Sequence, residues 1–380
     1  MPDVPCQGVR GQGVVIVLGS ARTPSRRAAR EEVMPPKRVT LADVARRAGL
    51  SPTAASMILN GRPDSRLSAD AHARVHEAAT ELGYRPNVAA RSLRTDKTLT
   101  IGFISDVVAT TRFASGLIRG ALDAAQRAGH VMLVLETGGD PARESEAIGA
   151  VLDRQVDGII FAVMRARELF VPEIPSTTRV VMLNATNKKH PVSVLPDELA
   201  GGASAVRLLA AAGHREGIAL IGHNAEAEKG LFRSTTVEQR ISGIRAEMAR
   251  QGLQFATEES CWDWEPHHGY DVTHALLERR RDIRALLCMN DRLAFGAYQA
   301  LANHGLTVPK DISVVSFDND ELASYLRPGL TTVGLPHEAM GRVSVEILLS
   351  PSAPSGSRLI PMPVIERTSV RPHPLDHATA

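Results

Sequence analysis

The chain has 380 residues, 43% of them hydrophobic and 23% charged, which is the composition of an ordinary soluble globular protein with room for several domains. It contains no apolar run near the ~20 residues that a membrane-spanning helix needs, so the sequence excludes helical membrane proteins. The three cysteines, Cys6, Cys261 and Cys288, are spaced too widely for a disulfide framework or a metal-ligand set. We therefore expect a reduced, cytoplasmic protein without a metal or another cofactor.

The net charge is only +2, but the positive charge is concentrated near the N-terminus. Residues 34–97 contain 11 Lys and Arg against 6 Asp and Glu. A small module with such a surplus suits a polyanionic partner. A solvated basic surface would have the same composition, so charge supports a nucleic-acid partner without deciding it.

The first residues show no packing pattern. Residues 14–18 are apolar but too few for a secretory signal, and the Arg- and Ala-rich stretch that follows is typical of disorder. Gly8, Gly11 and Gly13 do not have the order of a dinucleotide-binding loop.

Residues 37–85 predict three short helices. Thr40 is a suitable N-cap with Asp43 three residues later, and an apolar stripe follows until Gly49 ends the helix. Ser51 and Pro52 open a second helix, whose inward positions are Ala55, Ile58 and Leu59. A third helix begins at Ser68 and buries Ala71, Val75, Ala78, Ala79 and Leu82. Two short helices joined by a tight turn with a glycine form a helix-turn-helix.

Three blocks in this region resemble the headpiece of the lactose-repressor (LacI/GalR) family. They are V-T-L-x-D-V-A-x-x-A-G-x-S, S-x-x-L-N-G and E-L-G-Y-x-P-N-x-x-A-R-S-L, in this order and at the family's spacing. The resemblance implies a headpiece that binds double-stranded operator DNA. Family members usually begin as this chain does from Met34, so we expect residues 1–36 to be untranslated or disordered.

By this resemblance the second helix lies in the major groove, and Pro52, Thr53 and Met57 read base edges. Candidates for capping or for contacts to phosphates are Thr40, Ser51, Thr53, Ser56 and Asn60. The family commonly has Arg where this chain has Met57, and Met cannot contact guanine in the same way, so the operator sequence stays open.

Residues 86–97 resemble the family's hinge helix and linker. The resemblance implies that this helix orders on the operator, with Asn87 and Arg91 at the DNA and Leu93 wedged between base steps of the minor groove. A plain linker with an isolated leucine is the alternative.

Residues 98–370 alternate apolar strands with Ala-rich helices, the pattern of parallel sheets covered on both faces. We expect strands at 98–105, 131–137, 158–163, 179–185, 192–195, 217–222, 285–290, 313–318 and 331–335, with helices such as 114–129, 197–212, 237–251 and 291–304. So many strands favour two α/β lobes, followed by a tail at 371–380.

Polar residues end several strands, where ligands of such sheets bind: Asp106, Asn184, Asn290, Asp291 and Asp318. Each alone could equally be a helix cap, Asp291 above all.

The family resemblance continues through this region, in D-G-I-I at 157–160, G-H-R at 213–215, R-x-x-G at 240–243 and N-D-x-x-A-x-G at 290–296. It implies the two-lobed fold of periplasmic sugar-binding proteins, with the chain crossing between the lobes three times. The implied effector cleft is lined by Phe113, Asn184, Arg240, Trp264, Asn290 and Asp318. We expect Arg240 and Asp318 to face each other across that cleft. These side chains suit a sugar, although a purine stays open, and Leu335 is apolar where relatives often place a polar contact.

The fold class is therefore an all-α helix-turn-helix headpiece followed by a two-lobed α/β core with parallel sheets. We expect a transcriptional regulator, and on family habit a repressor, that acts as a homodimer under control of a small molecule; induction and co-repression stay open.

The alternative is a solute-binding protein of sugar transport, which would need an export signal and no headpiece. We expect no catalytic residue, because motifs of hydrolases, zinc proteases and P-loops are missing. The spacing of His267, His268 and His274 fits no metal site, so we expect them on a helix surface.

Overall fold

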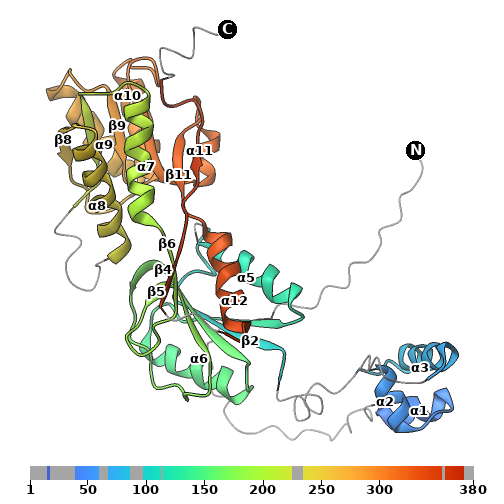
Figure 1. The fold of residues 1–380 in the computed structure, drawn as a ribbon. Helices are drawn as coiled ribbons and strands as arrows, with labels where there is room; N and C mark the ends of the chain where they lie inside the picture. The colour runs from blue at the N-terminus through green and yellow to red at the C-terminus, as the bar shows by residue number, and fades with distance from the viewer. Residues whose placement is uncertain are drawn as a thin grey trace, which may run out of the picture. The chain divides into compact units, whose positions relative to one another are not determined.

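The computed structural model describes residues 39–59, 67–85, 97–112, 114–224, 234–352 and 356–371, together with the backbone of residues 15–17. It divides into a small unit within Ser20–Thr98 and a large unit that holds Leu99–Ala380 and the first strand (Figure 1). We describe each unit by itself. Among the described residues, no helix combines the length and the apolar character needed to span a membrane.

The small unit contains helices α1 (Leu41–Ala48), α2 (Pro52–Leu59) and α3 (Ala69–Glu81). Thr40 caps α1 as predicted: its hydroxyl accepts the Asp43 N–H at 3.3 Å, and the Asp43 carboxylate accepts the Thr40 N–H at 2.9 Å. The hydrogen bonds from Thr40 hold the pKa of Asp43 below its ordinary value. Gly49 ends α1 with a φ of 66°, a left-handed conformation that glycine adopts without strain.

The buried face of the small unit is made of small apolar side chains. Ala45, Ala55 and Ala78 pack with larger Val44, Ile58 and Val75 in one cluster, and Leu59 and Leu82 cover its rim. The predicted helix-turn-helix is confirmed, with its inward residues on the expected face.

The first lobe of the large unit is built on a seven-stranded sheet with the order β1-β3-β2-β4-β5-β6-β12. Its pairings are all parallel. The strands are β1 (Val15–Val17), β2 (Thr100–Ser105), β3 (Val131–Glu136), β4 (Gly158–Glu168), β5 (Val180–Thr186), β6 (Ser193–Pro196) and β12 (Ser357–Ile360). Helices α5 (Ser115–Arg127), α6 (Pro141–Asp153) and α12 (His337–Leu349) belong to this lobe.

Strand β1 lies within residues 1–36, the segment that we expect to be untranslated or disordered. The backbone of residues 15–17 pairs with residues 133–135 of β3 at the edge of the sheet. An open sheet edge offers unpaired backbone groups, so a short apolar segment can add to it without a packing pattern of its own. The rest of 1–36 lies outside the described residues.

The second lobe has a six-stranded sheet with the order β13-β11-β10-β9-β7-β8. The strands are β7 (Ile218–Ile221), β8 (Phe255–Glu259), β9 (Ala285–Cys288), β10 (Ser313–Asp318), β11 (Thr331–Gly334) and β13 (Val364–Ile365). Only β13 runs antiparallel among the described strands. Helices α7 (Glu198–Ala211), α8 (Thr235–Arg250), α9 (Pro266–Arg279), α10 (Asp291–Asn303) and α11 (Glu321–Tyr325) complete the lobe.

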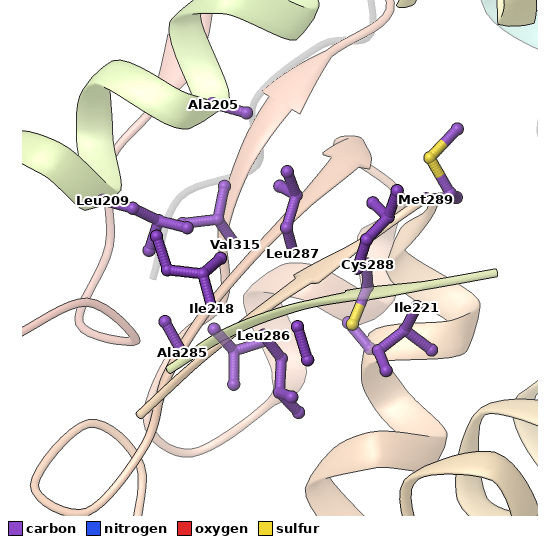
Figure 2. Packing of buried hydrophobic residues seen from close by; sticks show 14 of the residues in the cluster. Ala205, Leu209, Ile218, Ile221, Ala285, Leu286, Leu287, Cys288, Met289 and Val315 are labelled. Carbon is purple, nitrogen blue, oxygen red and sulfur yellow. The ribbon is translucent and has the colours of Figure 1, made fainter. Parts of the chain in front are cut away.

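The core of the second lobe lies where α7 covers the central strands. Figure 2 shows Leu209 of α7 beside Ile218, Val315 and Leu287 of three neighbouring strands. All four side chains are at most 1% exposed. Strands buried on both faces carry continuous apolar runs, which is why the sequence identified these strands.

The chain crosses between the lobes three times, after β6, after β11 and after β12. This confirms the predicted two-lobed architecture with parallel sheets.

Glycines set the spacing of the helix pair α7 and α8. A Cβ atom on Gly202 would lie 2.2 Å from the carbonyl oxygen of Arg240, and one on Gly243 would lie 2.0 Å from that of Leu199. No side chain fits at such distances, so the two backbones touch directly. Gly243 therefore lets α8 approach the start of α7 closely, and this approach sets the position of Arg240 relative to α7.

Candidate functional site: the headpiece helix and a buried charge cluster

Helix α2 presents the side chains predicted to meet DNA. Ser51, Pro52 and Thr53 are exposed, while Ser56 and Met57 are half-buried. The Ser51 hydroxyl accepts the Ala54 N–H at 3.1 Å, so this residue caps α2. Five predicted residues lie outside the described ones: Asn60, Asn87, Arg91, Leu93 and Phe113.

Three described basic residues of the headpiece, Arg46 and Arg47 of α1 and Arg74 of α3, have acidic neighbours. Arg46 pairs with Asp43 at 3.1 Å, and Arg47 pairs with Glu81 at 2.9 Å, both at the exposed surface. Such exposed pairs contribute little to stability and can exchange partners with phosphates. Helix α2 itself carries no charged residue, so its side chains offer only polar and apolar groups to a partner.

Arg240 of α8 is the centre of the charge cluster in the second lobe. Its side chain is 3% exposed, and its Nε and Nη2 atoms each donate to the Glu198 carboxylate at 2.7 Å. The Nη1 atom donates to the Met289 carbonyl at 2.7 Å. The guanidinium carbon lies 4.3 Å from the centre of the Phe317 ring and 6.0 Å from that of Trp264. Burial opposes the charged form of Arg240, but the neighbouring carboxylates outweigh it and raise the pKa.

Asp318 ends β10 beside Arg240. Its φ of 104° is unusual for a residue other than glycine, and its side chain is 9% exposed. The Asp318 Oδ1 atom lies 3.8 Å from the Nη2 atom of Arg240, which is beyond hydrogen-bond distance. Burial raises the pKa of Asp318 to about 8, although Arg240 opposes the shift. Strained backbone and perturbed carboxyl groups both cluster at functional sites, which makes Asp318 a candidate.

The sequence left open whether Asn290 or Asp291 caps α10, and the structure shows that Asn290 does. Asn290 is the cap of α10: its Oδ1 atom accepts the Leu293 N–H at 2.9 Å, and its amide donates to the Trp264 carbonyl at 3.2 Å. Asp291 is fully buried and accepts from the Ser316 hydroxyl and, at 2.7 Å, from the Asp320 N–H. Burial raises the pKa of Asp291 to about 6.

Asn184 lies in the first lobe and holds backbone rather than a partner side chain. Its amide donates to the carbonyls of Val163 and Met164 at 2.9 and 3.0 Å, where the pairing of β4 with β5 is irregular. Asp106 secures the same irregularity, because it accepts the Met164 N–H at 3.1 Å and pairs with Arg167 at 3.2 Å. Both strand-end residues therefore shape the carboxyl end of this sheet.

The structure brings four predicted effector residues together in the second lobe: Arg240, Trp264, Asn290 and Asp318. Arg240 and Asp318 lie 3.8 Å apart on a neighbouring helix and strand end, as expected, and both belong to the second lobe. The sequence analysis missed Glu198, the closest charged partner of Arg240. A glutamate in the first turn of a helix looks like a favourable charge at the helix N-terminus, so nothing in its local sequence signals a buried ion pair.

An ion pair joins the two lobes near this cluster. Arg112, which follows β2, pairs with Glu321, the first residue of α11, three residues after Asp318. Both side chains are exposed. Two shallow surface hollows lie elsewhere, along α3 and between α8 and β8, and neither touches the predicted effector residues.

The histidines of α9 fit the surface position predicted for them in part. His267 is exposed, while His268 and His274 are half-buried, and His274 Nδ1 lies 3.0 Å from His304 Nε2. Within the described part of the chain, no group of three His, Cys, Asp or Glu side chains has the arrangement to hold a metal ion.

Comparison with known proteins matches both units. Residues 40–87 match the family described as bacterial regulatory proteins, lacI family, and residues 206–370 match a periplasmic binding protein-like domain. The ribose operon repressor of Escherichia coli strain K12 is 32% identical over 315 residues, which are 82% of this chain and 92% of the relative. The chain belongs to the lacI family.

Other relatives agree. A transcriptional repressor named PurR from Vibrio cholerae is 31% identical over 82% of this chain and 90% of its own length. A crystal structure of the lac repressor dimer bound to operator and an anti-inducer is 28% identical, with a TM-score of 0.68 over 88% of this chain and 99% of that one. This lacI-family chain is a DNA-binding transcriptional regulator with an effector-binding domain, and the transport alternative is set aside.

Proposed function

We propose that this lacI-family protein is a homodimeric repressor whose binding to a pseudo-palindromic operator is controlled by a sugar. The headpiece of each protomer would place α2 in the major groove, with Pro52, Thr53 and Met57 at base edges and Ser51 and Ser56 near phosphates. Asn60 and Thr40 would add contacts to the DNA backbone. The hinge residues Asn87, Arg91 and Leu93 would order in the minor groove between the half-sites.

The buried charge cluster carries the effector half of the proposal. Arg240 and Asp318 lie together at the carboxyl edge of the second sheet, where ligands of parallel sheets bind. Carboxylate and amide groups accept and donate hydrogen bonds to neighbouring hydroxyls, and the indole of Trp264 offers an apolar face to a sugar ring. Asn184 and Phe113 would complete the site from the first lobe.

Relatives of the chain support a small polar effector. The ribose operon repressor is named for a pentose operon, and the second relative is named PurR, which keeps a purine as the competing ligand. The carboxyl groups around Arg240 favour the sugar, because a sugar offers several hydroxyl donors to them.

Control would run through the relative position of the lobes. The chain crosses between them three times, and Arg112 pairs with Glu321 of the other lobe, so a ligand held between them would favour one arrangement. A coupling of about 1–3 kcal/mol would change operator occupancy roughly 5- to 150-fold.

The decisive experiment measures operator release and ligand binding together. A library selection with the full chain supplies its operator, and fluorescence anisotropy then reports binding while sugars and nucleobases are added. A thermal-shift screen on the same ligands identifies the binder, since a ligand that prefers the folded state raises the Tm. A nucleobase that shifts both readouts, with no active sugar, would replace the sugar in this proposal.

A further inference from the structure

The cluster around Arg240 contains more acidic groups than basic ones. In the described part of the chain, the carboxyl groups of Glu198, Asp291 and Asp318 all act on this one guanidinium. Glu198 comes from α7, Asp291 from α10 and Asp318 from β10, so three separate elements converge on α8. With all groups ionised, the cluster is negatively charged.

The hydrogen bonds decide which of these groups a ligand can use. Glu198 accepts from Nε and Nη2 of Arg240 in a bidentate pair, and the Met289 carbonyl accepts from Nη1. Three of the five N–H groups of this guanidinium are therefore engaged, and the Nε–Nη2 edge is closed to a ligand. The two oxygens of Asp291 accept from Ser316 and from the Asp320 N–H. Among the described residues, no hydrogen-bond donor reaches the Asp318 carboxyl group, although nine-tenths of its side chain is buried.

We propose that Glu198 determines the charge selectivity of the effector site, so that it binds an uncharged hydroxyl-bearing ligand and rejects sugar phosphates and sugar acids. This inference rests on the proposed function. Phosphate and carboxylate groups bind best to an arginine that presents two parallel N–H groups and an uncompensated positive charge. In this chain Glu198 occupies the Nε–Nη2 pair and neutralises the charge of the guanidinium. Asp318 is left as the acceptor for a ligand hydroxyl.

The charged groups that face Asp318 agree with this selectivity. Within the described ranges they are Arg240 of α8, Glu198 of α7, Asp291 of α10 and Asp320, which caps α11. Three of the four are acidic, and the one cation is already bound to Glu198, so burial and this surplus keep the pKa of Asp318 at about 8. An anionic ligand would bring one more negative charge into the same place.

The first test compares matched ligands on the full chain. D-Ribose, ribose 5-phosphate and ribonate, and the corresponding glucose, glucose 6-phosphate and gluconate, are titrated at equal ionic strength and pH 7.5 while the Tm is recorded. We expect any active sugar to bind at least tenfold more tightly than its phosphate and its acid. A phosphate or acid that binds as tightly as its parent sugar would overturn the inference.

The second test needs no ligand. The Tm of the wild type, Glu198→Gln and Asp318→Asn is followed from pH 6 to pH 8.5. Because the pKa of Asp318 is about 8 in the folded chain and 3.8 ordinarily, the wild type loses stability as the pH rises toward 8. Asp318→Asn cannot ionise at this position and lacks this loss. In Glu198→Gln, Arg240 is free to pair with Asp318, so the loss disappears there as well. Glu346→Gln, which changes an exposed glutamate paired with Arg342, is the matched control and keeps the wild-type profile.

A Glu198→Gln profile equal to that of the wild type would contradict the role of Glu198. The two proposals fail separately. If operator binding responds to none of the sugars, sugar control is lost, whereas the pH profiles still report whether Glu198 sets the charge of this cluster.

Discussion

His214 Nε2 lies 2.8 Å from the Ser313 hydroxyl, in the interior of the second lobe. The histidine belongs to the G-H-R block and is 6% exposed. Burial, together with the positive charge of Arg371, lowers the pKa of His214 to about 4. The imidazole is therefore neutral in the folded chain at neutral pH, and its hydrogen bond ties the segment after α7 to the start of β10.

This pair predicts an acid-sensitive second lobe. The unfolded chain protonates His214 near its ordinary pKa of 6.5, whereas the folded chain resists protonation until about pH 4. Stability attributable to this residue is therefore present above pH 6.5 and is lost as the pH falls toward 4, by roughly 2–4 kcal/mol. Urea unfolding of the wild type and His214→Gln across this range measures it. A parallel decline in both proteins would show that His214 contributes nothing to the acid sensitivity.

The direct contact between α7 and α8 gives the second prediction. Gly243→Ala places a methyl group 2.0 Å from the Leu199 carbonyl oxygen, well inside van der Waals contact, so the helices must separate. We expect a loss of about 1–3 kcal/mol, as for other overpacked sites, and a weaker effector response because Arg240 moves relative to Glu198.

Gly149 of α6 is the matched control for this substitution. It lies in a helix interior, and none of the described atoms beyond its own helix turn comes within 4 Å of the position that a Cβ would take there. Gly149→Ala therefore removes only the entropic disadvantage of glycine and should gain about 0.5–1 kcal/mol in urea unfolding. Equal effects at both positions would mean that helix propensity alone, and not helix spacing, governs Gly243.

The sequence predicted the elements that have strong local signals. The Thr40 capping box, the turn at Gly49 and the buried strands β7, β9 and β10 all follow from neighbouring residues. Strands β8, β12 and β13 were not predicted, because they are short or lie at sheet edges and lack continuous apolar runs. Edge strands are held by backbone pairing that a neighbour supplies, which no local pattern records.

The pairing of side chains in the cluster was also beyond the sequence. Arg240 and Glu198 are 42 positions apart and meet only because Gly202 and Gly243 let α7 and α8 touch. Motif resemblance singled out Arg240 and Asp318 separately, but it could not tell which carboxylate would take the guanidinium.

Leu93 gives a prediction about DNA recognition, although it lies outside the described residues. If it is the minor-groove wedge, Leu93→Ala should weaken operator binding by a few kcal/mol at most and leave binding to random DNA nearly unchanged. The wedge acts only where DNA can kink, whereas Lys and Arg contacts to phosphates act on any sequence. Anisotropy titrations with both DNAs decide it, and equal losses would rule out the hinge.

The ion pair of Arg240 and Glu198 gives the last prediction. Arg240→Ala leaves a buried carboxylate without its partner, and breaking a buried pair from one side typically costs about 3–5 kcal/mol. Replacing both residues together, as Arg240→Met with Glu198→Met, removes the charge as well as its partner, so we expect most of the stability to return. Urea unfolding measures the three proteins, and operator anisotropy verifies that the headpiece still binds DNA. The double variant should still fail to respond to the effector, because Arg240 is part of the proposed site. If Arg240→Ala were as stable as the wild type, water or another cation would have to satisfy Glu198, and the cluster would not be held by this pair.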